Sequence, residues 1–183
     1  MIKDFIKRIL EKFNLEVNNK YIFETSDDPI EIIRRIFSTN DVNTIIDGGA
    51  SIGDISLKFA NYFPKSNVHC FEPYSEFNQL LSVRFKDNER ISIYPFALNS
   101  TNEKLNLYIN KSKGTNSTLP PASNGVSIYG TQFENTGLER TKAISLDNWA
   151  KQNNIHHIDI LKLDVQGTEL DVLKGAYDLL SSN

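Results

Sequence analysis

Apolar residues recur at helical spacing in two stretches near the start of the chain. In residues 1–13 they alternate with basic and acidic residues, which predicts an amphipathic helix whose apolar face holds Ile2, Phe5, Ile6, Ile9, Leu10 and Phe13. The sequence Ser26-Asp27-Asp28-Pro29 supplies polar caps and a first-turn proline, so a second helix is expected to begin there. Its buried stripe is predicted to contain Ile30, Ile33, Ile36 and Phe37. Residues 1–40 are therefore expected to form helices that pack on the domain that follows.

From residue 41 onward, short apolar runs alternate with helical patterns. Strands are predicted over residues 43–47, 67–71, 91–94 and 158–163. Helices are predicted to begin at Asp54 and to cover residues 75–85, 146–152 and 169–180, the last with Leu170, Leu173 and Leu180 facing inward. This alternation is typical of a parallel sheet with right-handed crossovers, so the chain is predicted to belong to the α/β class.

Residues 101–142 interrupt that alternation. Leu105, Leu107 and Ile109 alternate with polar residues, as in a strand, and residues 111–140 are rich in Gly, Ser, Thr, Asn and Pro. We interpret this insertion as a loop or β-excursion over the mouth of the sheet, where substrate loops commonly lie.

Composition and charge exclude several classes of protein. The 183 residues suit one domain with a substantial core. Twenty basic and 23 acidic residues, without a long run of either sign, argue against nucleic acid as a partner. The single cysteine, Cys70, excludes an internal disulfide, and no apolar run resembles a signal peptide or a membrane span. We therefore expect a cytoplasmic protein without stable membrane insertion.

The most informative motif is Asp47-Gly48-Gly49-Ala50-Ser51-Ile52-Gly53, which connects a strand to a helix through a tight turn. Glycine tolerates a positive φ angle, and its missing Cβ leaves room for a ligand. A carboxylate at the strand end suits an ammonium group and hydroxyls better than a pyrophosphate, which indicates a cofactor built from a nucleoside and an amino acid. Asp47, Glu72 and Asn99 all follow predicted strands, at the edge of the sheet where ligands bind.

Four segments in this order, IIDGGASIGDIS, CFEPYSE, SLDNWA and DILKLDVQGTELDVLKGA, resemble the FkbM family of methyltransferases over residues 44–176. The resemblance implies a Rossmann-like class I methyltransferase fold, with a mostly parallel sheet and helices on both faces, over residues 41–183. It also implies S-adenosyl-L-methionine (SAM) as cofactor and transfer of a methyl group to a hydroxyl of a sugar or natural-product acceptor. Such folds have seven strands, so further strands are expected beyond residue 183 and the chain is interpreted as truncated.

The family's cofactor-binding positions can be carried over to this sequence. The amino-acid moiety of SAM is expected to contact Asp47, Gly48, Gly49, Ala50 and Gly53. Glu72 is expected to accept hydrogen bonds from the ribose hydroxyls, because it lies 19 residues after Gly53, close to the spacing of about 20 between a glycine turn and a ribose-binding acid. Ala97 and Leu98 would border the adenine, and Asn99 would contact its edge.

Methyl transfer from SAM needs an aligned hydroxyl and a base. Asp164 and Glu169 are the two candidates for that base, and Glu169 has the alternative role of capping the helix that it begins. A divalent metal bound by Asp164 remains an alternative, but no cluster of histidine and acidic residues supports a metal site, so none is predicted. Gln166 stands where many members of the family have an acid; it keeps the hydrogen-bonding capacity and loses the charge.

Two other functions remain open at the level of sequence. One is a non-catalytic interaction module with a SAM-type fold. The other is a nicotinamide-dependent oxidoreductase, which is disfavoured because Asp47 would crowd a pyrophosphate and the turn departs from G-x-G-x-x-G. As partners we expect a small-molecule hydroxyl acceptor, with a saccharide among the candidates, and the N-terminal helix is compatible with a homodimer contact.

Overall fold

The computed structural model describes residues 28–37 and 41–181, which fall into two units, 1–37 and 38–183. In the first unit, helix α2 (Pro29–Ile36) begins where the capping sequence predicts it, and Asp28 accepts a hydrogen bond from the Ile30 backbone N–H at 3.0 Å. Ile30 is buried, but Ile36 and Phe37 are 61% and 50% exposed, so the predicted stripe is wrong at its end. Phe37 has extended backbone angles and leaves the helical face. The helix predicted over residues 1–13 lies outside the described residues.

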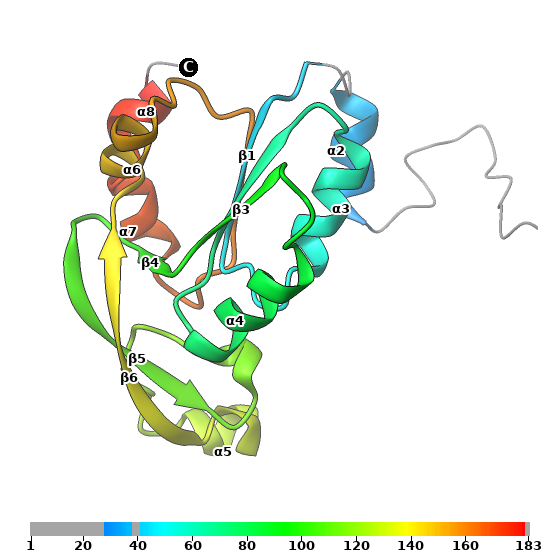
Figure 1. The fold of residues 1–183 in the computed structure, drawn as a ribbon. Helices are drawn as coiled ribbons and strands as arrows, with labels where there is room; N and C mark the ends of the chain where they lie inside the picture. The colour runs from blue at the N-terminus through cyan, green and yellow to red at the C-terminus, as the bar shows by residue number, and fades with distance from the viewer. Residues whose placement is uncertain (1–27, 38–40, 182–183) are drawn as a thin grey trace, which may run out of the picture. The chain divides into compact units, whose positions relative to one another are not determined.

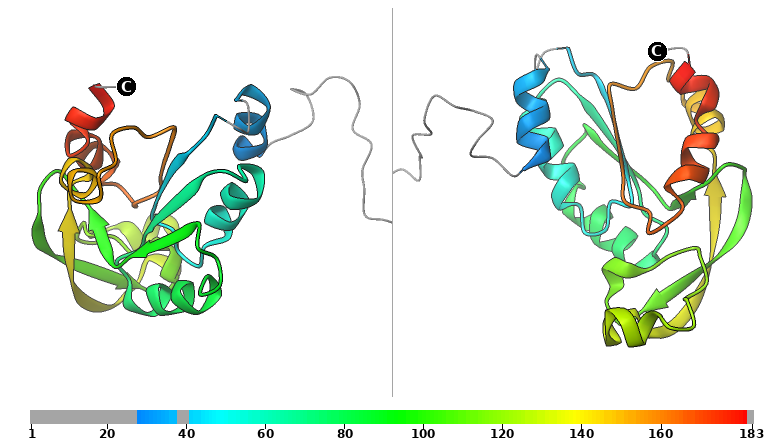
Figure 2. Two further views of the ribbon diagram at one scale, coloured as in Figure 1. Left: turned by 45° about the horizontal axis from the view of Figure 1, so that its top comes forward. Right: turned by 180° about the vertical axis from the view of Figure 1, so that it is seen from behind.

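A four-stranded, fully parallel sheet forms the centre of the second unit, in the order β3-β2-β1-β7. Its strands are β1 (Thr44–Gly48), β2 (Asn67–Phe71), β3 (Ile91–Tyr94) and β7 (Ile160–Leu163). Helices α3 (Asp54–Tyr62) and α4 (Ser75–Arg84) cover one face. Helices α6 (Leu146–Asn153), α7 (Glu169–Lys174) and α8 (Tyr177–Ser181) cover the other (Figures 1 and 2). The predicted α/β class is confirmed.

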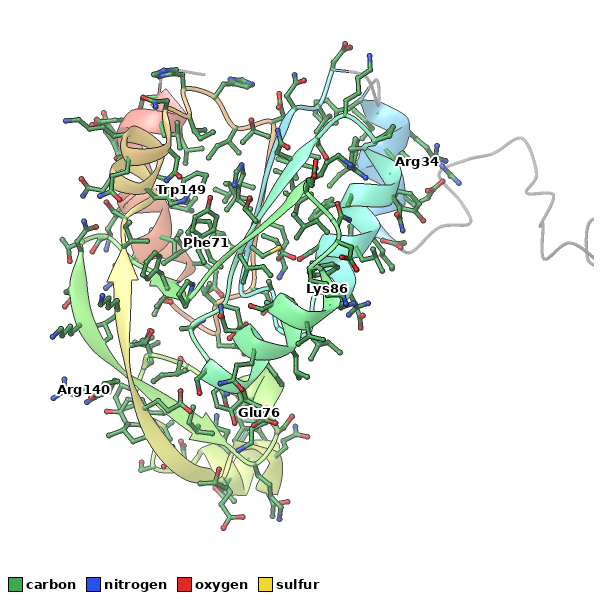
Figure 3. All side chains as sticks on the ribbon, viewed as in Figure 1. Arg34, Phe71, Glu76, Lys86, Arg140 and Trp149 are labelled. Carbon is green, nitrogen blue, oxygen red and sulfur yellow. The ribbon has the colours of Figure 1, made fainter. Side chains whose placement is uncertain are left out.

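The core between the sheet and helices α6–α8 is aromatic and aliphatic. Trp149 of α6 packs edge-on against Phe71 of β2, with ring centroids 5.2 Å apart, in the space between the two layers (Figure 3). Ile46 of the central strand belongs to the same cluster and is fully buried. Burial of these large side chains supplies most of the favourable free energy of folding on this face.

The predicted helix over residues 169–180 is divided in two, and its inward face is wrong. The buried residues are Val172, Ala176 and Leu179, whereas Leu170, Leu173 and Leu180 are 65%, 42% and 37% exposed. The division falls at Gly175, where an added Cβ would lie 2.2 Å from the Asn99 carbonyl oxygen. The close approach of these two backbones fixes which side of α7 and α8 faces the core.

The insertion and strand β4 (Phe96–Leu98), which precedes it, form a second sheet with the order β4-β6-β5. Its other strands are β5 (Glu103–Asn110) and β6 (Asn135–Ile144). Between β5 and β6 lie the short helices η1 (Lys113–Thr115), α5 (Gly125–Tyr129) and η2 (Thr131–Phe133) (Figure 1). The sequence pattern predicted β5 but not β6, because the first half of β6 is largely exposed and shows no apolar alternation. Within the ranges that the structure describes, none of the helices has the length and apolar character needed to cross a membrane.

Candidate functional site

A buried ion pair stands at the carboxyl end of the central strand. Asp47 is fully buried, and its Oδ1 lies 2.8 Å from Nζ of Lys162, which occupies the register position beside it on β7. Oδ2 of Asp47 accepts a hydrogen bond of 2.6 Å from the Ser56 hydroxyl on α3. Lys162 also donates to the carbonyl oxygens of Gly48 and Gly49, at 3.2 and 2.9 Å. One ammonium group therefore holds both the carboxylate and the glycine turn.

The glycine turn packs against the chain's own backbone. Gly49 has a φ of +72°, and a Cβ there would lie 2.0 Å from the carbonyl oxygen of Asp164. Gly53 has a φ of +86°, and a Cβ there would lie 2.5 Å from the Phe85 ring. We expected the missing Cβ atoms to make room for a ligand, but at these two positions the room is taken by neighbouring parts of the protein.

Glu72 follows β2 directly and faces the same edge of the sheet. Its side chain accepts hydrogen bonds from the backbone N–H groups of Ser51, at 2.7 Å, and Tyr74, at 2.9 Å. Burial raises the pKa of Glu72 to about 7, and these two donors together with the Lys162 ammonium offset only part of that effect. A carboxylate has about four acceptor positions, so two remain for hydroxyl groups of a ligand.

A cleft of about 610 Å³, its open mouth included, lies at the carboxyl ends of β1, β2 and β7. It brings together five of the predicted site residues: Gly49, Glu72, Ala97, Leu98 and Asp164. The insertion contributes Leu107 and residues 113–114 and 116–118 to the lining. The cleft therefore has acidic groups at the strand ends, an apolar wall beside them and a polar wall from the insertion.

The other predicted site residues do not line this cleft in the described part of the chain. Asp47 and Gly48 end β1, and Ala50 and Gly53 lie in the turn that follows. None of the four lines the cleft, so they shape it indirectly. Asn99 follows β4, and its side-chain amide donates to Glu103 at 3.0 Å. Glu103 is the first residue of β5, the strand that follows β4 along the chain, so its carboxylate lies within reach of the Asn99 amide.

Asp164 and Glu169 have different environments. Asp164 is exposed in the cleft, and its Oδ1 accepts a hydrogen bond of 3.1 Å from the Gln166 side-chain amide. Glu169 instead accepts from the backbone N–H groups of Val165, at 3.0 Å, and Gly167, at 3.1 Å. Burial raises the pKa of Glu169, but backbone donors outweigh it, so its pKa is lowered. This geometry favours the capping role of Glu169 over the role of base.

Gln166 connects the turn after β7 to the insertion. The side-chain amide of Gln166 also donates to the Gly114 carbonyl at 3.1 Å. The backbone carbonyl of Gln166 accepts a hydrogen bond from the Ser117 hydroxyl at 2.8 Å. The roles of Gln166 and Lys162 in holding the site together were not predicted. A lysine inside an otherwise apolar strand is the signal that could have identified Lys162, since a buried ammonium needs a nearby anion or carbonyls. Across residues 28–37 and 41–181 no group of three or more potential metal ligands occurs.

Comparisons with known proteins find methyltransferases. The model of the methyltransferase FkbM domain matches residues 47–183. Among curated proteins, 2-O-methyltransferase NoeI from Sinorhizobium fredii (strain NBRC 101917 / NGR234) is 24% identical over 148 residues, 75% of this chain and 58% of the relative. Methyltransferase sdnD from Sordaria araneosa is 29% identical over 154 residues, 72% of this chain and 59% of the relative.

The chain therefore spans somewhat over half the length of these curated relatives. The crystal structure of Methyltransferase FkbM from Methylobacillus flagellatus KT matches with a TM-score of 0.51 and 19% identity, over 79% of this chain and 31% of that one, which shows that the fold is shared. The match of the family model to most of the chain shows that the protein belongs to the FkbM methyltransferase family.

Proposed function

We propose that the protein is a SAM-dependent methyltransferase that acts on a hydroxyl oxygen of a small molecule. The observation that carries this proposal is the placement of the buried Glu72 carboxylate in the same cleft as an apolar wall. A carboxylate can accept from two vicinal ribose hydroxyls, and Ala97 and Leu98 offer apolar lining to an adenine ring. The similarity to a 2-O-methyltransferase supports oxygen as the atom that receives the methyl group.

In this proposal Asp47 is a positioning residue. It is fully buried and paired with Lys162 and Ser56, so it acts on the cofactor through the shape of the glycine turn. Glu169 likewise orders the turn that carries Asp164, since it accepts from backbone N–H groups of that turn. Neither residue needs to touch the cofactor for its loss to weaken binding.

Asp164 is the proposed base. When bound, SAM supplies an electrophilic methyl group, and its transfer breaks the carbon–sulfur bond, forms a carbon–oxygen bond and leaves S-adenosylhomocysteine. Asp164 accepts the hydroxyl proton, and the hydrogen bond from Gln166 fixes the orientation of its carboxylate.

The first test is calorimetric titration of the protein with SAM, S-adenosylhomocysteine and NAD. Saturable binding of S-adenosylhomocysteine is expected, and Glu72→Ala should weaken it by tenfold or more, because hydrogen bonds to a charged group contribute roughly 1.5–3 kcal/mol each. Glu89→Ala is the matched control, since Glu89 is exposed and outside the cleft, and it should bind as the parent does. Thermal unfolding of each variant shows whether it is folded.

Three results would change the proposal. Tighter binding of NAD than of SAM would favour an oxidoreductase. Absence of S-adenosylhomocysteine binding in a folded sample would contradict the cofactor assignment. Binding without turnover over a panel of hydroxylated acceptors would favour the non-catalytic module.

A further inference from the structure

A concave surface lined mainly by cations lies on the small sheet β4-β6-β5. It encloses about 780 Å³, its open mouth included, and Lys104 of β5 lines it together with Arg140, Thr141 and Lys142 of β6. None of these four residues lines the proposed cofactor cleft. Three of the four side chains carry a positive charge, so we call this surface the cationic concavity.

Strand pairing places the three cations on one face of that sheet. Lys104 lies directly opposite Lys142 in the antiparallel register, and Arg140, two residues before Lys142, points to the same side. The other face of β5 is buried at Leu107, which lines the proposed cofactor cleft. Figure 3 shows Arg140 projecting from β6 away from the central sheet. The cationic concavity and the cleft therefore lie on opposite faces of the small sheet.

Among the described residues, none of the three cations has an ion-pair or hydrogen-bond partner for its side chain. Glu103 and Glu139, the acids next to them in the sequence, alternate to the opposite face. Glu103 accepts hydrogen bonds from the side chains of Asn99 and Thr101, at 3.0 and 2.7 Å. Glu139 accepts one from the Ser75 hydroxyl at 3.1 Å. Like charges directly opposite each other on paired strands are destabilising, so this uncompensated cluster points to an anion supplied from outside the chain.

The size of the cluster indicates which anion it suits. Residues opposite each other on paired strands lie about 5 Å apart, and residues two positions apart on one strand lie about 7 Å apart, so the three long side chains can converge on one small polyanion. Electrostatic attachment to a membrane uses clusters of roughly four to eight cations. Nucleic-acid binding uses a wider basic patch, whereas this chain has a net charge of −3. Three cations therefore suit a compact phosphate group better than an extended anionic surface.

We propose that the cationic concavity binds the diphosphate group of a small molecule. The ammonium groups of Lys104 and Lys142 donate to one phosphoryl group, and the guanidinium fork of Arg140 donates to the other, as arginine commonly does with phosphate oxygens. Because this face of the sheet is turned away from the cleft, the site does not depend on the proposed function. A diphosphate and S-adenosylhomocysteine are therefore expected to bind at the same time.

The test is calorimetric titration of the full chain with sodium pyrophosphate, without divalent cations and at low ionic strength, since salt screens exposed charges. Saturable binding is expected, and Arg140→Gln and Lys142→Gln should each weaken it at least fivefold, because each removes a charge-assisted donor. Lys65→Gln is the matched control: it removes the same charge from an exposed lysine outside the concavity and should leave the affinity within twofold of the parent. Thermal unfolding of each variant shows whether it is folded.

Amide chemical shifts locate the bound anion in the parent protein. Pyrophosphate should shift the signals of residues 104–106 and 140–142 and leave those of β1 and the glycine turn unchanged.

Three results would overturn the site. One is the absence of saturable pyrophosphate binding, or binding that neither Arg140→Gln nor Lys142→Gln weakens fivefold. Another is displacement of pyrophosphate by S-adenosylhomocysteine, which would assign the anion to the cleft. The third is binding to phosphatidylserine vesicles that depends on these cations while pyrophosphate does not bind, which would assign the face to a membrane surface. Failure of S-adenosylhomocysteine to bind would contradict the proposed function and leave this site standing.

Discussion

The two walls of the proposed cofactor cleft, one at the strand ends and one in the insertion, are built from different kinds of interaction. The strand-end wall is held by backbone packed against backbone at Gly49 and, behind the surface, by a buried ion pair between Asp47 and Lys162. The insertion wall consists of turns and partly exposed side chains, tied to the sheet through Gln166. The first wall cannot change without disturbing the sheet, whereas the second can change while the fold stays intact. A cofactor common to many reactions suits the first wall, and a variable acceptor suits the second.

The largest difference between the walls is expected from adding a single methyl group. Gly49→Ala forces a positive φ on alanine and places its Cβ 2.0 Å from the Asp164 carbonyl oxygen, so it should destabilise the protein by about 4 kcal/mol. Gly114→Ala in the insertion is the control, because its added Cβ meets no described atom within 4 Å and should cost less than about 0.5 kcal/mol. Urea unfolding measures both. Similar losses for the two variants would contradict the distinction.

The second prediction concerns the buried charges. Lys162→Met leaves the Asp47 carboxylate buried without its cation and should destabilise the protein by about 3 kcal/mol, the lower end for a broken buried pair because Lys162 is 23% exposed. Adding Asp47→Asn to that variant removes the unpaired charge and should restore part of the loss. Lys113→Met in the insertion removes an exposed ammonium near the Tyr74 ring and should change stability by less than about 1 kcal/mol. Chemical denaturation of these three variants and of the parent protein provides the test.

The pH dependence of stability separates two carboxylates at this site. The pKa of Glu72 is raised to about 7 in the folded protein, above its usual value of 4.5, so the folded state binds more protons than the unfolded state between these values. Stability should therefore fall as pH rises from about 4.5 to about 7, with a slope of at most about 1.4 kcal/mol per pH unit from this group. Glu72→Gln should remove that component of the slope.

Glu169 should behave in the opposite way. Its pKa is lowered in the folded protein, so its contribution to stability is present above the usual carboxyl pKa and is lost as pH falls through the folded value. Glu169→Gln should flatten the acidic limb and leave the interval above pH 4.5 nearly unchanged. Unfolding free energies measured from pH 3 to 8 test both carboxylates, and an unchanged profile in either variant would contradict its assignment.

Local sequence patterns predicted the parallel sheet well because its strands are short, mostly apolar runs bounded by turn residues. β2 and β3 have the predicted limits, and the cleft contains Gly49, Glu72 and Asp164, which follow strand ends directly. The failures arise where tertiary contacts decide. The first half of β6 lacks an apolar pattern. The buried face of α7 and α8 depends on the contact between Gly175 and Asn99, and the ion-pair partner of Lys162, Asp47, lies on another strand. None of these contacts leaves a periodic signal in the chain.

The smallest effect is expected at the joint between the two walls. Gln166→Ala removes the hydrogen bonds to the Gly114 carbonyl and to Asp164, and it should cost about 1 kcal/mol or less, because both are solvent-accessible. Amide hydrogen exchange should quicken in residues 113–117 and stay unchanged in β1, since the ion pair and the glycine turn do not depend on this side chain. Ser117→Ala removes the hydrogen bond from the Ser117 hydroxyl to the backbone carbonyl of Gln166, and it should quicken exchange in the same segment. Faster exchange in β1 in either variant would mean that the walls are mechanically coupled, and acceptor recognition could then not vary independently of the cofactor site.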